Sequence, residues 1–244
     1  MFTPNILVAD GRYYLGYCAI AAFSSAEEMA ALPDGQFMAA ADSPYGPWER
    51  LGAFLWPVDD PDRFDSFRVD GLSFLRRNDR NWVYYKGRQK GRSPGDTKLG
   101  LATADSPAGP WQRYTGNPVI PSGHEVMFWP HGHGVATVIN WAGEQANTVQ
   151  YSADGVNFSI VGGVENPPDA PSHYCPDCFE ETSDHPGVDW GVCMVKSLDP
   201  LPYLVRWECP DLRFDPDARQ QTGNESLHCT GISRGKSVPC GSHE

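Results

Sequence analysis

The stretch ADSPYGPWER at residues 41–50 returns as ADSPAGPWQR at residues 104–113, so that its aspartate recurs 63 positions later. Both copies contain Ser-Pro and Gly-Pro dipeptides, which are typical of tight turns. A turn and an aromatic-rich segment precede each copy, as DGRYYLGY at residues 10–17 and as DRNWVYYK at residues 79–86. A weaker third copy of the turn element is YSADGVNF at residues 151–158. The chain is therefore built from a repeated unit.

Each unit reads as three strands, a tight turn and a short outer strand that begins near the Trp or Phe. A four-stranded antiparallel unit that recurs roughly every 50–65 residues predicts an all-β fold, the β-propeller. A β-sandwich is the alternative, but its turns recur about every 8–12 residues without a long period. We expect about four blades, near residues 1–58, 59–118, 119–164 and 165–213, followed by a mobile polar tail over residues 214–244.

Composition excludes several classes of function. The 244 residues carry 19 Lys and Arg against 31 Asp and Glu, a formal net charge of −12. Scattered basic residues on an acidic chain argue against nucleic-acid binding, and they fit a neutral polar ligand better than a polyanion. No apolar run of about 18 residues predicts a membrane span, and no signal peptide is visible. We expect a soluble chain, and its compartment stays unknown.

Local motifs add three smaller predictions. Residues 21–32 predict one short helix, capped at Ser24 or Ser25. The His-x-His pair at residues 131–133 lies between Pro130 and glycines, which favours a hairpin tip over a metal site. Seven cysteines at irregular spacing, with a lone Cys-x-x-Cys at residues 175–178, favour neither a regular disulfide framework nor a structural zinc.

The candidate site starts from two elements in equivalent places. His124 and Glu125 occur in SGHEV at residues 122–126, at the mouth of the third unit's first strand. Asp70 occurs in FRVDGLSF at residues 67–74, at the mouth of the second unit's first strand. The innermost strands of a propeller surround an axial cavity, so these side chains should converge. The alternatives are an aspartate that only ends a strand and a loop histidine that is bonded to backbone.

Carboxylates beside a protonatable histidine suit glycosidic-bond cleavage. That reaction needs a proton on the leaving oxygen, and a carboxylate that activates water or attacks carbon. A neighbouring carboxylate is expected to raise the pKa of His124 and favour its acid form. Neighbours on a regular strand point to opposite faces. His124 and Glu125 can share the cavity only if the backbone is irregular there, which Gly123 permits.

Further side chains could contact a sugar. Trp129 could stack on a sugar ring, or it could belong to the core between blades. The core is the favoured place for Tyr84. Lys86 and Arg88 line the cavity in one interpretation and are solvated in the other. We take Trp129, Lys86 and Arg68 as the candidate substrate-binding residues.

Several of these motifs resemble glycoside hydrolase family 117. The resemblance covers about residues 1 to 210. The residues that carry it most specifically are SGHEV at 122–126, with Trp129 and Pro130, and NTVQYSADGVNF at 147–158. Weaker matches, to the family's second and third blades, are FTPNIL at 2–7, FRVD at 67–70 and YYKGR at 84–88. The resemblance implies a five-bladed propeller. It also implies an exo-acting α-1,3-(3,6-anhydro)-L-galactosidase that acts on neoagaro-oligosaccharides from agar.

The resemblance also implies roles for particular residues. His124 resembles the family's general acid, and Asp70 resembles its second active-site aspartate, which tunes and orients. Glu125, with Asp70 beside it, resembles a carboxylate associated with a water-coordinated divalent cation at the propeller axis. The implied partners are an oligosaccharide substrate and a second copy of the chain in a homodimer.

The sequence departs from the family pattern at its beginning. The family's general-base aspartate lies in a first blade, upstream of the FTP element with which this sequence opens. Thr3 and Pro4 stand roughly where a carboxylate would sit in this blade, so this unit cannot supply the missing base. The family's dimerising N-terminal segment is likewise missing. We therefore expect a glycosidase that lacks its first blade. Two alternatives stay open: a non-catalytic carbohydrate-binding propeller, and a related propeller glycosidase with a base such as Asp177 or Asp184.

Overall fold

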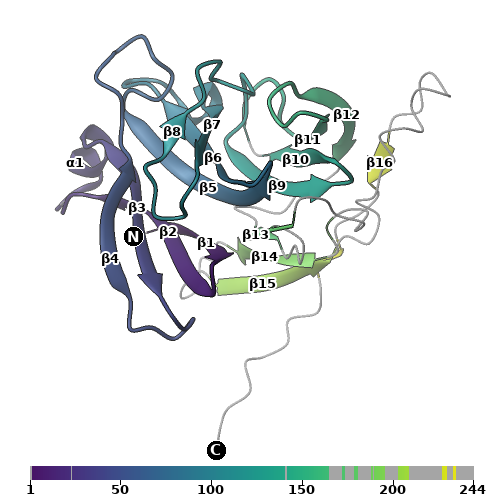
Figure 1. Ribbon diagram of the computed structural model, residues 1–244. Helices are drawn as coiled ribbons and strands as arrows, with labels where there is room; N and C mark the ends of the chain where they lie inside the picture. The colour runs from purple at the N-terminus through teal and green to yellow at the C-terminus, as the bar shows by residue number, and fades with distance from the viewer. Residues whose placement is uncertain are drawn as a thin grey trace, which may run out of the picture.

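The computed structural model describes residues 2–22, 24–140, 142–164, 172–173, 179–180, 188, 190–195, 203–208, 227–229 and 233–234. These residues form strands almost throughout, arranged as antiparallel sheets around a common centre (Figure 1). The all-β class predicted from the repeat is confirmed. No helix among them is long and apolar enough to cross a membrane.

The first two repeats form two successive meanders. The first meander comprises β1 (Phe2–Ala9), β2 (Arg12–Ile20), β3 (Asp34–Ala41) and β4 (Glu49–Leu55). The second meander comprises β5 (Arg68–Arg77), β6 (Arg80–Arg88), β7 (Lys98–Ala104) and β8 (Gln112–Arg113). Strands β3 and β5 meet in parallel at the single pair Asp34 and Arg68, which joins the two meanders into one eight-stranded sheet.

Two further sheets follow the meanders. They are called the third and fourth sheets here, because each meander is counted as one. The third sheet comprises β9 (Glu125–His131), β10 (Gly134–Asn140), β11 (Thr148–Ser152) and β12 (Ser159–Val164), with β16 (Leu227–Cys229) parallel to β12. The fourth sheet comprises β13 (Ser172–His173), β14 (Trp190–Val195), β15 (Tyr203–Glu208) and β17 (Ser233–Arg234). Strands β16 and β17 fall inside the segment that the sequence predicted to be a polar tail. The Cys-x-x-Cys at residues 175–178 and the candidate bases at 177 and 184 lie outside the described residues.

The sequence repeat is also a structural repeat. In the turn of the first copy, the Gly46 N–H donates to the Ser43 carbonyl, and in the second copy Gly109 donates to Ser106, both at 2.9 Å. Both glycines have a positive φ, 85° and 95°, which favours glycine. Two ion pairs recur as well: Arg12 with Asp42 at 2.8 Å, and Arg80 with Asp105 at 2.7 Å.

Three hydrophobic clusters fill the spaces between neighbouring sheets, because alternate residues of each strand point to opposite faces. One joins the two meanders and includes Leu7, Tyr14, Met38, Phe74 and Val83. The next joins the second meander to the third sheet and includes Leu75, Trp82, Tyr84, Phe128 and Ile139. The last joins the third and fourth sheets and includes Met127, Trp129, Val138, Cys193 and Trp207.

Local predictions agree with the structure. Helix α1 (Ala26–Ala31) begins after Ser25, whose side chain accepts the Glu28 N–H at 3.1 Å. The Glu28 carboxylate in turn accepts the N–H of Ser24 at 2.8 Å, so the two ends of the first turn cap each other. The His-x-His segment is the hairpin tip between β9 and β10, with Gly132 at φ 56°.

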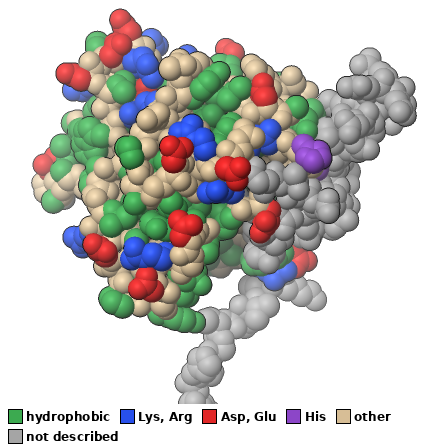
Figure 2. Space-filling model, in the orientation of Figure 1, with side chains coloured by type: hydrophobic (Ala, Val, Ile, Leu, Met, Phe, Trp, Pro, Cys, Tyr) green, Lys and Arg blue, Asp and Glu red, His purple; other side chains and the backbone are tan. Residues whose placement is uncertain are grey.

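Acidic and basic side chains are interspersed on the surface. In the view of Figure 2, Lys and Arg lie next to Asp and Glu over the middle of the molecule. No region of a single sign dominates the described part of that face.

Candidate active site

The site begins where β5 and β6 pair. Asp70 lies directly opposite Lys86 in this antiparallel ladder, so that both side chains project to the same side. The Lys86 Nζ lies 3.0 Å from Asp70 Oδ1. A bulge follows Asp70 at Gly71, whose φ of 57° suits glycine. A Cβ at Gly71 would lie 2.5 Å from the Lys86 Cε, so the bulge also makes room for the lysine chain.

A second carboxylate reaches the same ammonium from the third sheet. Glu125 opens β9, and its Oε2 lies 3.6 Å from the Lys86 Nζ. Its other oxygen, Oε1, lies 3.6 Å from the Nε2 of His124. The preceding Gly123 has a φ of 124°, so the backbone is irregular at this point, as the sequence required. His124 and Glu125 are thereby brought to one side of the chain.

Thr97 holds the imidazole from the other side. Its Oγ1 lies 3.0 Å from the Nδ1 of His124. Thr97 directly follows a short 3₁₀ helix, η1 (Pro94–Asp96), and the Pro94 carbonyl accepts a further hydrogen bond from the His124 ring. Nδ1 therefore faces Thr97, and Nε2 lies on the side of Glu125.

Arg68 is held by a buried aspartate. The Asp34 Oδ2 lies 2.5 Å from the Arg68 Nη1, and its Oδ1 accepts the Val69 N–H at 3.0 Å. The other end of the Arg68 guanidinium donates to the Met29 carbonyl at 3.0 Å. Asp34 and Arg68 are the backbone pair that joins β3 to β5, so the ion pair lies at the junction of the two meanders.

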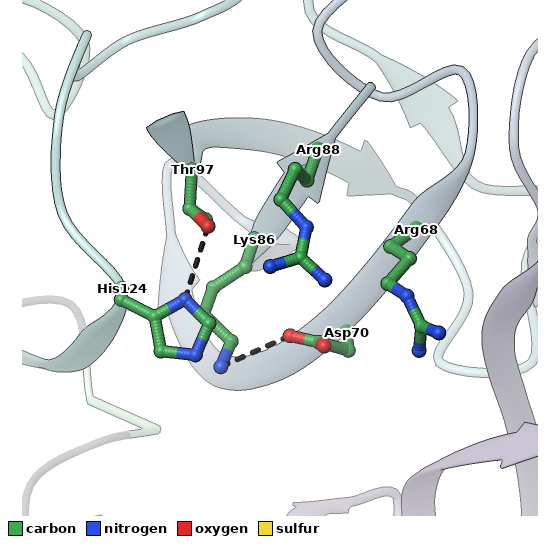
Figure 3. Close-up of a pocket in the computed structure, with 7 residues that line it drawn as sticks. Arg68, Asp70, Lys86, Arg88, Thr97 and His124 are labelled. Carbon is green, nitrogen blue, oxygen red and sulfur yellow. Dashed lines mark hydrogen bonds and ion pairs between the residues drawn. The ribbon is translucent and has the colours of Figure 1, made fainter. Parts of the chain in front are cut away.

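These groups surround one pocket. Its lining residues are Arg68, Asp70, Lys86, Gly87, Arg88, Thr97 and His124. Figure 3 shows the Lys86 ammonium reaching Asp70 and the His124 ring turned toward Thr97. In the same view the Arg88 guanidinium points into the space bounded by Lys86, Asp70 and Arg68.

Electrostatics assign the charge states. Burial raises the pKa of Asp70, but the Lys86 ammonium outweighs burial, so the net direction is downward. Burial lowers the pKa of Lys86, but Asp70 and Glu125 outweigh it and the net direction is upward. Burial, and then the charge of Lys86, lower the pKa of His124 to about 4. At neutral pH the site therefore holds an ionised Asp70, a charged Lys86 and a neutral imidazole.

The charge state of His124 corrects the prediction from sequence. A neighbouring carboxylate was expected to raise its pKa, and Asp70 does act in that direction. Burial and the Lys86 ammonium act in the opposite direction and prevail. Lysine and histidine are 38 residues apart in the chain, so the sequence did not show that they meet.

The structure brings together His124, Asp70, Lys86 and Arg68, and Glu125 joins them through Lys86. It moves Trp129 out of this group. That side chain is fully buried in the cluster between the third and fourth sheets, so it does not offer the stacking surface predicted for a sugar. Tyr84 is likewise fully buried, and it stacks on Phe128 with ring centroids 3.9 Å apart.

Sequence reasoning missed two residues of the site, Asp34 and Thr97. Asp34 opens a strand of the first meander, and Thr97 follows the turn SPGD at residues 93–96. Neither residue type at such a position indicates a site, because a strand end and a turn are common places for both. Only the register between β3 and β5, and the path of the loop before β7, bring them to the pocket.

The carboxylates predicted to lie near a divalent cation do not fit that role as a pair. Asp70 and Glu125 both approach the Lys86 Nζ, at 3.0 and 3.6 Å. The ammonium thus occupies the position from which a cation would bridge the two carboxylates, and it supplies the positive charge there.

Comparisons with known proteins place this geometry in context. No family model and no curated protein matches the sequence. Among solved structures, the chain is similar to Zg3597, a family 117 glycoside hydrolase of the marine bacterium Zobellia galactanivorans, with 31% identity and a TM-score of 0.73. This chain has the fold of the propeller-type glycoside hydrolases. The match covers 84% of this chain and 60% of the Zobellia protein, so the chain spans less than two thirds of that protein's length.

More distant structures share the fold alone. A family 32 β-fructofuranosidase of Bombyx mori, in complex with sucrose, aligns with a TM-score of 0.62 and 12% identity over 96% of this chain and 48% of its own. A family 43 β-1,3-galactosidase aligns with a TM-score of 0.57 and 12% identity, over 84% of this chain and 72% of its own. The predicted propeller fold is therefore confirmed, and the number of blades stays a prediction.

Proposed function

We propose that this chain is a glycosidase of the family 117 type, which removes a terminal 3,6-anhydro-L-galactose from agar-derived neoagaro-oligosaccharides. The observation that carries the proposal is the convergence of Asp70 and His124 on one pocket, where Glu125 reaches the same Lys86 ammonium as Asp70. The 31% identity to the Zobellia enzyme supports the same family. Several glycosidase families share this fold, so the fold alone does not identify the substrate.

In this proposal His124 delivers the proton to the leaving oxygen from Nε2, the ring nitrogen beside Glu125. The Thr97 hydroxyl, which contacts Nδ1, orients the ring so that Nε2 stays on the Glu125 side. Asp70 stays ionised and, with Lys86, holds hydroxyl groups of the sugar. A proton on His124 is stabilised by the Glu125 carboxylate, which lies 3.6 Å from Nε2.

The reaction also requires a base that activates water. Within the described part of the chain, the carboxylates near the pocket are already engaged. Asp70 and Glu125 face Lys86, and Asp34 is fully buried against Arg68. We propose that the base comes from outside the described residues.

The test is hydrolysis of neoagarobiose and neoagarohexaose, followed by detection of the released anhydro-sugar. We expect His124→Gln to lower the rate by roughly 10²–10⁴-fold, the usual size of an acid–base contribution. Asp70→Asn should lower it by roughly 10- to 100-fold, because a hydrogen bond from the sugar to a charged group is lost. Glu49→Gln, a carboxyl-to-amide change on the exposed strand β4, is the matched control and should keep the rate. Proton NMR of the first-formed anomer should show inversion. Release of a retained anomer contradicts this mechanism.

Sugar binding without turnover is the second candidate. It is favoured by the pKa of His124, which burial and Lys86 lower to about 4, so that the ring is neutral at pH 7. In this case titration calorimetry detects binding of neoagarobiose, and no product forms even at high protein concentration. Turnover that disappears in His124→Gln rules this candidate out.

A further inference from the structure

The pocket contains three cationic side chains, and the protein supplies close partners for two of them. Arg68 is paired with Asp34 at 2.5 Å and bonded to the Met29 carbonyl. Lys86 is paired with Asp70 at 3.0 Å and with Glu125 at 3.6 Å. The acceptors around these two cations are therefore committed.

Arg88 is the third cation, and it differs from the other two. It ends β6, its side chain is half-buried, and its guanidinium points into the pocket (Figure 3). Among the described residues, no side chain or carbonyl forms a hydrogen bond or ion pair with this guanidinium. Asp70, Asp34 and Asp96 attract it only at longer range, and Asp70 already faces Lys86.

The surroundings of Arg88 disfavour its charge. Burial, and then the neighbouring charge of Arg68, lower the pKa of Arg88, and the distant carboxylates do not fully compensate. A guanidinium presents several N–H donors in a planar fork that matches the oxygens of a carboxylate or a sulfate. A neutral sugar hydroxyl could accept one of these bonds, but it would not offset the positive charge.

We propose that the pocket binds its saccharide through an anionic substituent, a carboxylate or a sulfate, which Arg88 receives with Arg68 beside it. This inference rests on the proposed function, because it names the class of sugar for the same pocket. Among agar-derived oligosaccharides, fragments that carry such a substituent are then preferred over neutral ones. The acidic net charge of the whole chain does not oppose this, because three cationic side chains line the pocket itself.

Three monosaccharides that differ only at carbon 6 make matched probes: galactose, galactose 6-sulfate and galacturonic acid. Binding to the full chain is measured by saturation-transfer NMR and calorimetry at fixed ionic strength. We expect one or both acidic sugars to bind at least about tenfold more tightly than galactose. Which of the two binds distinguishes a sulfate from a carboxylate.

Arg88→Gln should weaken binding of the acidic sugar by roughly 10- to 100-fold, the usual contribution of a hydrogen bond to a charged group, and weaken galactose binding much less. Arg88→Lys keeps the charge but loses the fork, so it should recover only part of the affinity. Arg92→Gln removes the same charge from an exposed position outside the pocket lining, and it should have little effect.

Several results would overturn the inference. Equal binding of all three sugars, no binding of any of them, or equal losses in Arg88→Gln and Arg92→Gln would each do so. The result is separable from the proposed function. Cleavage of neoagarobiose with no preference for an acidic sugar defeats this inference alone. Arg88-dependent binding of an acidic sugar without hydrolysis of any oligosaccharide defeats the proposed glycosidase instead.

Discussion

Lys86 controls the charge states of the candidate site. Its side chain is nearly inaccessible, and its ammonium lies between carboxylates from two different sheets. Its positive charge keeps Asp70 ionised, and it adds to burial in lowering the pKa of His124, so that the imidazole is neutral. One residue therefore acts on both groups that the proposed chemistry needs.

Replacing Lys86 should be costly. In Lys86→Met the chain volume is kept, but Asp70 and Glu125 lose their counter-charge in a mostly buried place. Removing one partner of a buried ion pair destabilises a protein by about 3–5 kcal/mol. Guanidinium unfolding should show a loss of this size, whereas Lys90→Met, at an exposed position, should change stability by less than about 1 kcal/mol. Equal losses in the two variants contradict the role given to Lys86.

Thr97 is a positioning residue for His124. Thr97→Val keeps the shape but removes the hydroxyl that lies 3.0 Å from Nδ1, which frees the ring to turn. Loss of one such bond predicts about a tenfold lower kcat, together with altered imidazole nitrogen shifts in NMR. Thr97→Ser should restore both. An unchanged spectrum of His124 in Thr97→Val argues that Thr97 has a packing role only.

The pH profile reports on His124 directly. If this imidazole is the general acid, its protonated fraction falls tenfold for each pH unit above its pKa, which is about 4 in the free protein. We therefore expect kcat/KM to rise as the pH is lowered from 7 toward 4, since kcat/KM follows the free enzyme. A profile that is flat from pH 5 to 7 contradicts this role for His124.

At the level of elements, β5 owes its function to one irregularity. The bulge between Asp70 and Leu72 is centred on Gly71, and it places Asp70 opposite Lys86. Gly71 has a positive φ, and the lysine chain fills the space that a Cβ would take. The bulge therefore directs the Asp70 carboxylate toward Lys86, and it also makes room for the Lys86 side chain.

Gly71→Ala should disturb the site beyond its effect on the backbone. A residue with a Cβ at positive φ costs roughly 1–2 kcal/mol, and at Gly71 the Lys86 chain must move as well. Gly11→Ala is the matched control, because Gly11 has a φ of 73° and nothing lies within 4 Å of the added atom. We expect both variants to lose stability, and only Gly71→Ala to lose sugar binding and activity. Normal binding in Gly71→Ala contradicts this account.

At the level of the whole molecule, hydrophobic clusters alternate with sheets, and polar groups lie within that stack. Arg77 links two of the layers: its guanidinium donates to the carbonyls of His133 and Ala153 of the third sheet, each at 2.6 Å. His173 belongs to the fourth sheet, and its ring lies edge-on to Trp129. Burial lowers the pKa of His173, so its titration is linked to the stability of the fold.

The free energy of unfolding should fall as the pH drops from about 6.5 to about 4. Burial lowers the pKa of His124 and of His173 from 6.5 to about 4, so the unfolded chain binds more protons in that window. Asp34 opposes this, since burial raises its pKa from 3.8 to about 6 and its contribution is lost as the pH rises through 6. Because two histidines act against one aspartate, the free energy of unfolding falls overall on acidification.

Urea unfolding between pH 4 and 7 measures this slope. Each histidine contributes up to about 1.4 kcal/mol per pH unit. His173→Gln and His124→Gln should each flatten the dependence, and Asp34→Asn should steepen it. A slope that neither histidine variant changes contradicts the assignment.

The sequence by itself determined the all-β repeat, the short helix and most of the pocket's residues. These follow from local physics. The turns at residues 41–50 and 104–113 need the same Ser-Pro and Gly-Pro dipeptides, Ser25 caps the following turn, and the mouths of inner strands converge in any propeller. His124, Asp70 and Lys86 could be named on that basis before any contact was known.

Only the tertiary structure decided the charge states and the membership of the site. The pKa of His124 depends on an ammonium 38 positions away, and Arg68 depends on Asp34 across a single strand junction. Trp129 belongs to the core because alternate residues of β9 face different neighbouring sheets. Burial and Coulomb energy depend on distance in space, and the sequence alone does not contain that distance.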